Sequence, residues 1–418
     1  MRKIVFIIVV VALALPIHAA DRELTLAREM LEDAIIRDDV EGMRLTRERL
    51  LQIAGDADDR TIERDAHYLI GLSALFESFT GLIDQPTGAK ALATGIRHAD
   101  RAIELDPQFA DAWMISSLLR SSAQRFGMTV PKDPPGSPSR FQHAIELDAK
   151  APAVALFNGV LRSFNPAGAA PPQAVQLIDD LASRLDADRA ATGRRFGFWD
   201  AEAHVWQIFV RRASDDPRAE ILRPMATRLM EQRPDFALGR QVAEAVAERR
   251  FVAAPVLQWQ PFLTDPAGDG KNPKLPDVIA VDRAEDADRL WYRITVHDPL
   301  PRSLGVNLVI NRSGDTTQGA QWWGATPFRF DRLVTAWISR DGDRYFGTVG
   351  VTDADGVRGM RMAKIPADIQ LATDNGGRTL ILSVPRAVLG LTDASRMVVG
   401  VGSHLVWNDD AASVANSR

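Results

Sequence analysis

The residues best suited to bind a ligand lie in the second half of the chain, where two adjacent tryptophans follow a glutamine. Trp322 and Trp323 come directly after Gln321, in a polar stretch over 316–326 that has the composition of a loop. The apolar face of a sugar stacks on an indole ring, while amide and carboxylate groups bind its hydroxyls. The pattern therefore predicts a carbohydrate site, to which the nearby polar residues Asn311 and Asp315 also belong.

Packing is the alternative role for every aromatic side chain in this half. The aromatic residues concerned, besides the pair above, are Trp259, Trp291, Tyr292, Trp337, Tyr345, Phe346 and Trp407. Because β-sandwiches commonly bury tryptophan, we expect Trp291, Trp337 and Trp407 to pack in the core. For Trp322 and Trp323, binding and packing are equally consistent with a position in a loop.

Acidic residues in turns could hold a cation. Asp265, Asp269 and Asp277 lie in one loop, and further turns carry Asn311, Asp315, Asp353 and Asp355. Calcium takes six to eight oxygen ligands, and clustered aspartates can supply them, so the first three residues predict a calcium site. No stretch matches an EF-hand loop, and Asp-Gly pairs are also ordinary turn formers, so solvated turns are the alternative.

Catalytic motifs give little support to an enzyme. The chain has no G-x-S-x-G, H-E-x-x-H or phosphate-loop pattern. His297 and His404 are the histidines of the second half, and a haem could use one of them with Met360 or Met362, although single histidines in strands are more often structural. A glycosidase with paired carboxylates stays open, because the spacing of the two groups cannot be seen in a sequence.

Charge and the first twenty residues bear on partners and location. The net charge of -5 argues against a nucleic-acid partner. Arg2 and Lys3, a run of 14 residues from Ile4 to Ile17, and Ala19 and Ala20 together predict a cleaved export signal, since a bilayer span needs roughly 20 apolar residues. The absence of cysteine excludes disulfides and a lipid-modified cysteine. We expect a periplasmic or secreted protein with no membrane span after cleavage.

A change of periodicity near Phe251 divides the chain. Residues 21–250 have apolar side chains at helical spacing, and a Pro-rich linker with a first edge segment follows over 251–276. Residues 277–418 have the alternation and turn residues of an antiparallel β-sandwich. The predicted fold class is therefore α+β with two domains. The predicted strands are Val278–Val281, Leu290–Val296, Gly305–Ile310, Leu333–Ser339, Tyr345–Val351, Thr379–Val384 and Met397–Leu405.

The second domain resembles family 9 carbohydrate-binding modules and the related DOMON-like sandwiches over about 262–407. The similarity lies in the acidic, Gly-rich entry Asp265–Gly270, the strand openings Pro276–Val281 and Asp288–Ile294, and the acidic turn after Asn307–Asn311. The resemblance implies an extracytoplasmic β-sandwich that binds a sugar, or haem in some relatives, often with a structural calcium ion.

The first domain resembles tetratricopeptide repeats over about 66–148. The phrase Ala102–Pro107 recurs as Ala144–Ala149, and Trp113 follows the first copy at the family's spacing; a weaker echo spans Arg228–Phe236. The second copy lacks the proline, and an irregular helical bundle would use the same turns. The resemblance implies a concave surface that contacts a protein or peptide.

These observations favour an exported, non-catalytic binding protein with a protein or peptide partner for the helices and a glycan or other extracellular ligand for the sandwich. Two other functions stay open: a structural or assembly factor of the cell envelope, and a hydrolase with an unrecognised carboxylate pair.

Overall fold

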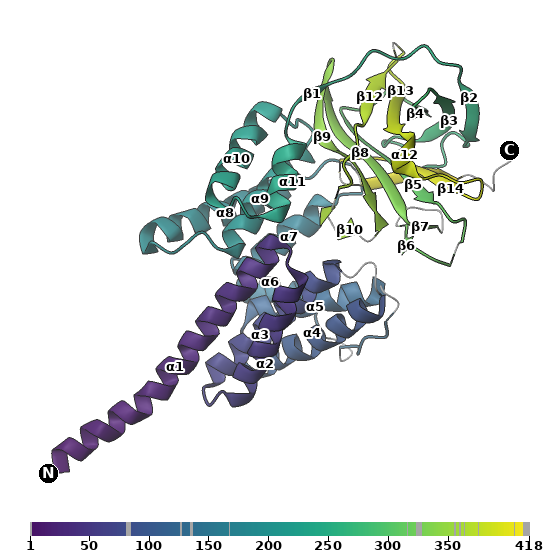
Figure 1. Cartoon of the computed structure of the whole chain (residues 1–418). Coiled ribbons are helices and arrows are strands. Elements are labelled where there is room, and N and C mark those ends of the chain that lie inside the picture. The colour runs from purple at the N-terminus through teal and green to yellow at the C-terminus, as the bar shows by residue number, and fades with distance from the viewer. Residues whose placement is uncertain are drawn as a thin grey trace. The chain divides into compact units, whose positions relative to one another are not determined.

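A computed structural model describes residues 2–80, 85–125, 128–133, 137–166, 168–315, 317–322, 328–354, 357–358, 361–362, 364–374, 376–404 and 406–412. Helices fill the first part of the chain up to Ala245, and antiparallel sheets follow from Arg249 (Figure 1). The predicted α+β fold class is therefore confirmed. Within the described residues, none of the helices has the length and apolar character needed to cross a bilayer.

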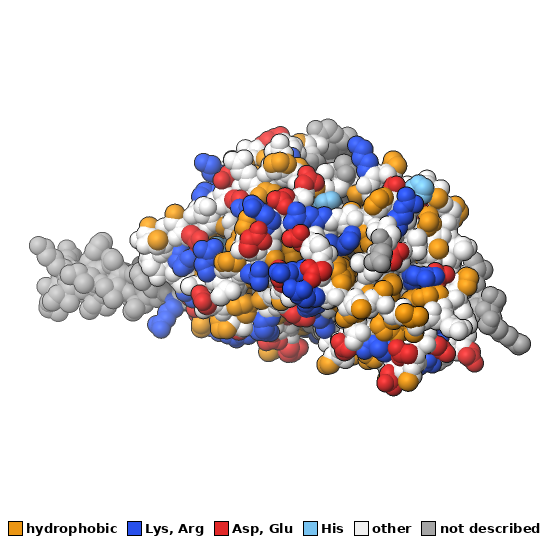
Figure 2. Space-filling model, turned by 90° about the horizontal axis from the view of Figure 1, so that it is seen from above, with side chains coloured by type: hydrophobic (Ala, Val, Ile, Leu, Met, Phe, Trp, Pro, Cys, Tyr) orange, Lys and Arg blue, Asp and Glu red, His pale blue; other side chains and the backbone are white. Residues whose placement is uncertain are grey.

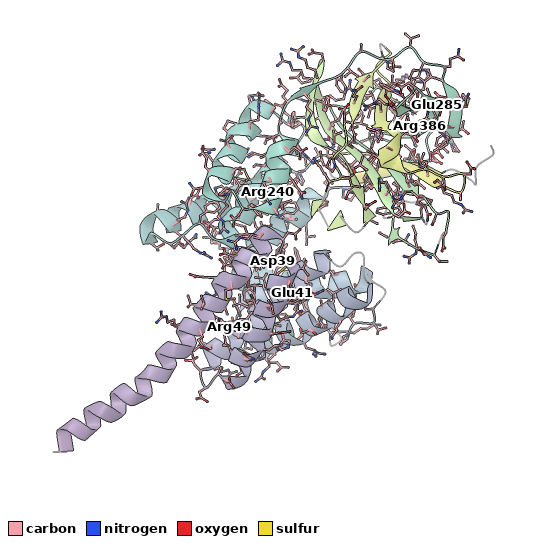
Figure 3. All side chains as sticks on the ribbon, in the orientation of Figure 1. Asp39, Glu41, Arg49, Arg240, Glu285 and Arg386 are labelled. Carbon is pink, nitrogen blue, oxygen red and sulfur yellow. The ribbon has the colours of Figure 1, made fainter. Side chains whose placement is uncertain are left out.

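Helices make up the first part of the chain. They are α1 (Arg2–Arg37), α2 (Val40–Asp56), α3 (Arg60–Thr80), α4 (Gln85–Leu105), α5 (Ala110–Arg125), α6 (Arg140–Asp148), α7 (Pro152–Ser163), α8 (Pro172–Thr192), α9 (Phe198–Arg212), α10 (Ala219–Gln232) and α11 (Ala237–Ala245). Asp39, labelled in Figure 3, starts α2 by accepting the Gly42 N–H at 2.9 Å. A Cβ on Gly95 would lie 2.6 Å from the Cβ of Ala74, so glycine lets α3 and α4 approach closely.

Packing divides the chain into two compact units. The first comprises Met1–Asn158, Ser183–Glu202 and Asp235–Ala237, and the second comprises Gly159–Ala182, Ala203–Pro234 and Leu238–Arg418. The second unit thus contains helical segments as well as the sheets. The helix-to-strand change near Phe251 follows secondary structure, whereas the division between the two units follows the tertiary contacts of the backbone.

Two antiparallel sheets form the β-sandwich. The larger has the order β1 (Arg249–Arg250), β9 (Arg344–Asp353), β8 (Arg332–Asp341), β5 (Ser303–Asn311), β14 (Arg396–Ser403) and β15 (Val406–Ala412). The smaller has the order β12 (Gln370–Thr373), β13 (Thr379–Pro385), β4 (Arg289–Val296), β3 (Val278–Glu285) and β2 (Gln260–Thr264). Each of the seven predicted strands is found, and β1, β2, β12 and β15 are additional members of these two sheets.

Strand alternation decides which residues fill the core between the sheets. In β4, Tyr292, Ile294 and Val296 point inward and are buried, and Arg293 and Thr295 lie on the other face. Trp291, which was expected in the core, also lies on that other face, where it is buried in a separate small cluster. On the larger sheet the inward residues include Val306, Leu308, Val334, Ala336, Val349 and Val401. The intervening residues of β5, β8, β9 and β14 therefore form an outer face, turned away from the sandwich core.

Charged side chains of both signs are mixed on the face of the molecule shown in Figure 2, where Lys and Arg are interspersed with Asp and Glu. Many of these charges are paired, as Arg386 of the short helix α12 (Arg386–Leu389) and Glu285 of β3 are at 3.0 Å, labelled in Figure 3. Such exposed pairs contribute little to stability, typically below about 1 kcal/mol.

Candidate functional site

Trp322 is a packing residue in this structure. Its side chain is 2% exposed, and its Nε1 donates to Asp410 Oδ2 at 2.8 Å. The ring meets Trp407 edge-on at 5.2 Å between centroids, and Phe330 at 6.5 Å. A ring enclosed in this way offers no open face to a sugar, which corrects the expectation that Trp322 stacks on a ligand. Trp323 lies outside the described residues.

The polar residues predicted beside the tryptophan pair shape the turn after β5. Asn311 is buried; its Nδ2 donates to the carbonyls of Asp315 and Arg329 at 2.8 and 3.0 Å, and its Oδ1 accepts the Gly314 N–H. Asp315 accepts from the N–H and hydroxyl of Thr317, and these hydrogen bonds lower the pKa of Asp315. Asn311 therefore has a structural role here.

Gln321 and Asp315 remain on the outside of this turn. Gln321 is exposed, and its amide donates to the Trp322 carbonyl at 3.3 Å. Gly314 has a φ of +73°, and a Cβ there would lie 2.5 Å from the Ala394 carbonyl oxygen, so only glycine fits. Among the described residues of this segment, Asn311 holds the turn, while Gln321 is exposed.

An aromatic face lies on the outer side of the larger sheet instead; we define it as Trp322, Trp337 and Trp407. Trp337 was expected in the sandwich core, yet strand register places it opposite Gly305 and Thr348 on the outer face. Its ring lies over Gly305, where a Cβ would be 2.9 Å from the indole. Trp337 and Trp407 meet edge-on with centroids 4.5 Å apart.

Glycine makes room for the aromatic face. A Cβ on Gly400 of β14 would lie 2.8 Å from Trp322 and 3.6 Å from Trp407. Trp337 and Trp407 are only partly buried. Trp407, like Trp337, was expected in the core, and the absence of side chains at Gly305 and Gly400 is what allows the indoles to lie on the sheet.

Hydrogen-bonding groups adjoin these rings. The Trp337 Nε1 is buried and has no acceptor among the described residues, which is costly by about 1–3 kcal/mol for a buried donor. In the next row of the same face, the Thr335 hydroxyl donates to Asn307 Oδ1 at 2.7 Å, and Asp410 lies opposite Gly400. A binding site for a polar, ring-shaped ligand is expected to combine partly exposed aromatic rings with a hydrogen-bond donor that lacks an acceptor in the protein, and the Trp337 Nε1 is such a donor.

A carboxylate cluster forms at one end of the sandwich; we define it as Asp265, Asp269 and Asp409. One carboxylate oxygen of each lies within 4.8 Å of the other two. Burial, followed by repulsion from Asp409 and Asp269, raises the pKa of Asp265 to about 7, and burial likewise raises the pKa of Asp409 to about 6. The predicted residues Asp265 and Asp269 are therefore brought together, and the third member comes from β15.

Asp277, the remaining residue of the calcium prediction, organises the loop that carries the cluster. Its two carboxylate oxygens accept the N–H groups of Gly268 and Gly270 at 2.8 and 3.0 Å. Asn408 fastens the same loop by accepting the Asn272 N–H at 2.6 Å and donating to the Pro276 carbonyl at 2.9 Å. Asp277 thus fixes the backbone on both sides of Asp269 and does not itself belong to the cluster.

A β-bulge at Asn408 places the two aspartates of β15, Asp409 and Asp410, on opposite faces of the sheet. Val401 pairs with Asp409 while Gly402 pairs with Trp407, so Asn408 is the extra residue. Trp407 and Asp410 therefore both contact Trp322 on the outer face. Asp409 points the other way, where its Oδ2 accepts the Val278 N–H at 2.9 Å. The run Trp407-Asn408-Asp409-Asp410 is the sequence signal that the prediction missed.

The cluster fits a calcium ion. Calcium–oxygen distances of about 2.3–2.6 Å put ligands on opposite sides of the ion about 5 Å apart, close to the spread of the three carboxylates. Asp265 Oδ2 is buried and lacks a hydrogen-bond partner among the described residues, as an oxygen that faces a cation would. Asp265, Asp269 and Asp409 would hold the ion, whose charge would offset their repulsion.

The other residues singled out in the sequence lie apart from these two sites. His297 is exposed, and His404 lies in the β14–β15 turn with its Nδ1 at 2.9 Å from Ser403 Oγ. Asp353 pairs with Arg332 at 2.7 Å. Asp355, Met360 and the side chain of Met362 lie outside the described residues, so the haem prediction is untested.

No protein-family model matches the chain, and no curated protein was found to be similar to it.

Proposed function

We propose that the chain is an exported, non-catalytic binding protein whose β-sandwich binds a carbohydrate on the aromatic face. The observation that carries the proposal is the Trp337 indole, a partly exposed ring whose buried Nε1 has no acceptor among the described residues. Sugars combine apolar C–H faces with hydroxyl acceptors, and an indole with a free N–H matches both. Trp407, edge-on to Trp337, extends the ring surface.

A calcium ion in the carboxylate cluster is part of the proposal. The resemblance to carbohydrate-binding sandwiches, which often hold a structural calcium, and the convergence of three carboxylates both support it. When bound, the ion would supply positive charge that joins the loop of Asp265 and Asp269 to β15. Its role would be to stabilise the sandwich near the aromatic face, since Asp410 follows Asp409 directly and accepts from Trp322.

The helical part would contact a protein or peptide, as in tetratricopeptide repeats. Three turns support the resemblance: α4 leads into α5 through Pro107, α6 leads into α7, and α10 leads into α11 through Pro234. At the first turn the Trp113 Nε1 donates to the Pro107 carbonyl at 3.0 Å, and Ala102 is fully buried where α4 packs. The sequence pattern of the first twenty residues, which predicts an export signal, supports the proposed extracytoplasmic location.

Glycan binding by the mature full-length chain tests the proposal. We expect oligosaccharide binding on a glycan array, and quenching of tryptophan fluorescence by the bound sugars. Trp337→Phe keeps an aromatic ring but removes the N–H, so it should weaken binding about tenfold. The control Trp291→Phe changes a buried indole on the smaller sheet and should leave affinity unchanged. Absence of binding, or equal losses in both variants, would refute the proposal.

A further inference from the structure

Arg212 is a buried cation at the edge of the aromatic face. It is the last residue of α9, its side chain is 8% exposed, and its Nη1 donates to the hydroxyl of Thr348 at 3.2 Å. The guanidinium also lies 5.5 Å from the centre of the Phe209 ring. Both residues belong to the same compact unit as the sandwich.

No carboxylate among the described residues pairs with Arg212. Its neighbour Arg211, by contrast, donates to Asp179 at 2.5 Å. Burial lowers the pKa of Arg212 to about 10, and the group stays charged at neutral pH. A buried charge without a counter-ion is strongly unfavourable, so buried arginines are ordinarily paired. Among the described residues, Arg212 therefore lacks the carboxylate counter-ion that a buried guanidinium ordinarily has.

Strand register places this cation beside the tryptophans. Thr348, which accepts from Arg212, is the cross-strand partner of Trp337. The row continues through Gly305 and Gly402 to Trp407, all on the outer face. The Trp337 N–H, which lacks an acceptor, therefore lies near the Arg212 guanidinium, which lacks a counter-ion. Both groups are next to the partly exposed rings of Trp337 and Trp407.

We infer that the carbohydrate bound on the aromatic face is acidic, with its carboxylate paired with Arg212 and its ring against Trp337 and Trp407. This inference rests on the proposed function and adds the substrate class, a saccharide that contains a uronic acid. Guanidinium groups bind carboxylates with two parallel N–H donors, and such charge-assisted bonds are about twice as strong as neutral ones. A neutral sugar would leave the guanidinium without a counter-ion.

Calorimetric titration of the mature full-length chain with two matched ligands tests the inference. The ligands are an oligogalacturonate and the same oligosaccharide with its carboxylates methyl-esterified. We expect the free acid to bind about 10- to 100-fold more tightly, by the strength of hydrogen bonds to charged groups. Arg212→Gln should abolish this preference, because the free acid should lose its added affinity and bind no more tightly than the ester. The control Arg293→Gln, on the smaller sheet, should keep the preference.

The outcomes separate the two proposals. Equal affinity of wild type for acid and ester, or an undiminished preference in Arg212→Gln, overturns the acidic ligand while leaving carbohydrate binding in place. Binding of neither ligand, together with an array that shows no other glycan, overturns the proposed function as well. If Arg212→Gln does not fold, the acid–ester comparison on the wild-type protein decides, because it needs no variant.

Discussion

Asp265, in the loop after β2, and Asp409, on the last strand of the sandwich, bring carboxylate oxygens within 4.8 Å of each other. The two residues come from opposite ends of the domain sequence. Their mutual repulsion costs free energy in the metal-free protein, and a cation between them would turn that cost into a cross-link between the entry loop and β15.

Calcium should therefore stabilise the protein. Because an ion that binds only the folded state shifts the free energy of unfolding by mass action, calcium at 100 times its Kd should add about 2.7 kcal/mol. Differential scanning calorimetry in EDTA and in excess calcium measures this shift. Asp409→Asn removes one ligand and should suppress it, whereas Asp298→Asn, an exposed aspartate elsewhere, should respond like wild type. A full calcium response in Asp409→Asn would contradict the site.

Much of the sandwich could be predicted because its strands alternate regularly. The strand predicted over Leu290–Val296 is found as β4, Arg289–Val296, and the acidic loop holds Asp265 and Asp269 close together. These features depend on residues that are close in the sequence. Local patterns of period two and clustered turn residues carry that information.

Asp409 and the aromatic face could not be predicted, for two physical reasons. β15 carries three polar residues in succession, which hides its alternation, and the bulge at Asn408 then reverses the faces. The burial of Trp322 depends on the missing side chain of Gly400, a residue on another strand. Neither a bulge nor the space above a glycine is visible in a local pattern.

Trp322 should contribute to stability and not to ligand affinity. Trp322→Phe loses the N–H that donates to Asp410 and leaves a small cavity, so we expect the free energy of unfolding to fall by about 1–3 kcal/mol. Chemical denaturation measures the loss, and titration with the sugar bound by wild type measures affinity. A large affinity loss with unchanged stability would instead assign Trp322 to the binding site.

Asp111 should make stability depend on pH. It is buried at the start of α5, where its Oδ1 accepts the N–H groups of Ala153 and Val154. Burial, against these two hydrogen bonds, raises the pKa of Asp111 from 3.8 to about 6. Between these values the folded state binds more protons than the unfolded state, so this group's contribution to stability falls as pH rises.

The variant Asp111→Asn isolates that contribution, since asparagine does not titrate. The difference in free energy of unfolding, wild type minus variant, should decrease as the pH rises from about 4 to about 6 and then become constant. Urea denaturation across this range measures it. A difference that increases with pH would mean that the hydrogen bonds from the α7 N-terminus outweigh burial and that the pKa is lowered.

Arg212 gives a prediction whose sign separates a ligand-binding role from a structural one. If the charge of Arg212 is compensated only by a bound ligand, it destabilises the ligand-free protein. Arg212→Met removes that charge and keeps much of the packing volume, so it should raise the free energy of unfolding by about 1 kcal/mol or more. The matched variant Arg211→Met breaks an existing ion pair with Asp179 and should lower it or leave it unchanged. Calorimetric unfolding without sugar measures both. A loss of stability in Arg212→Met would show that the guanidinium is already satisfied, because only a group whose interactions outweigh its desolvation stabilises the fold.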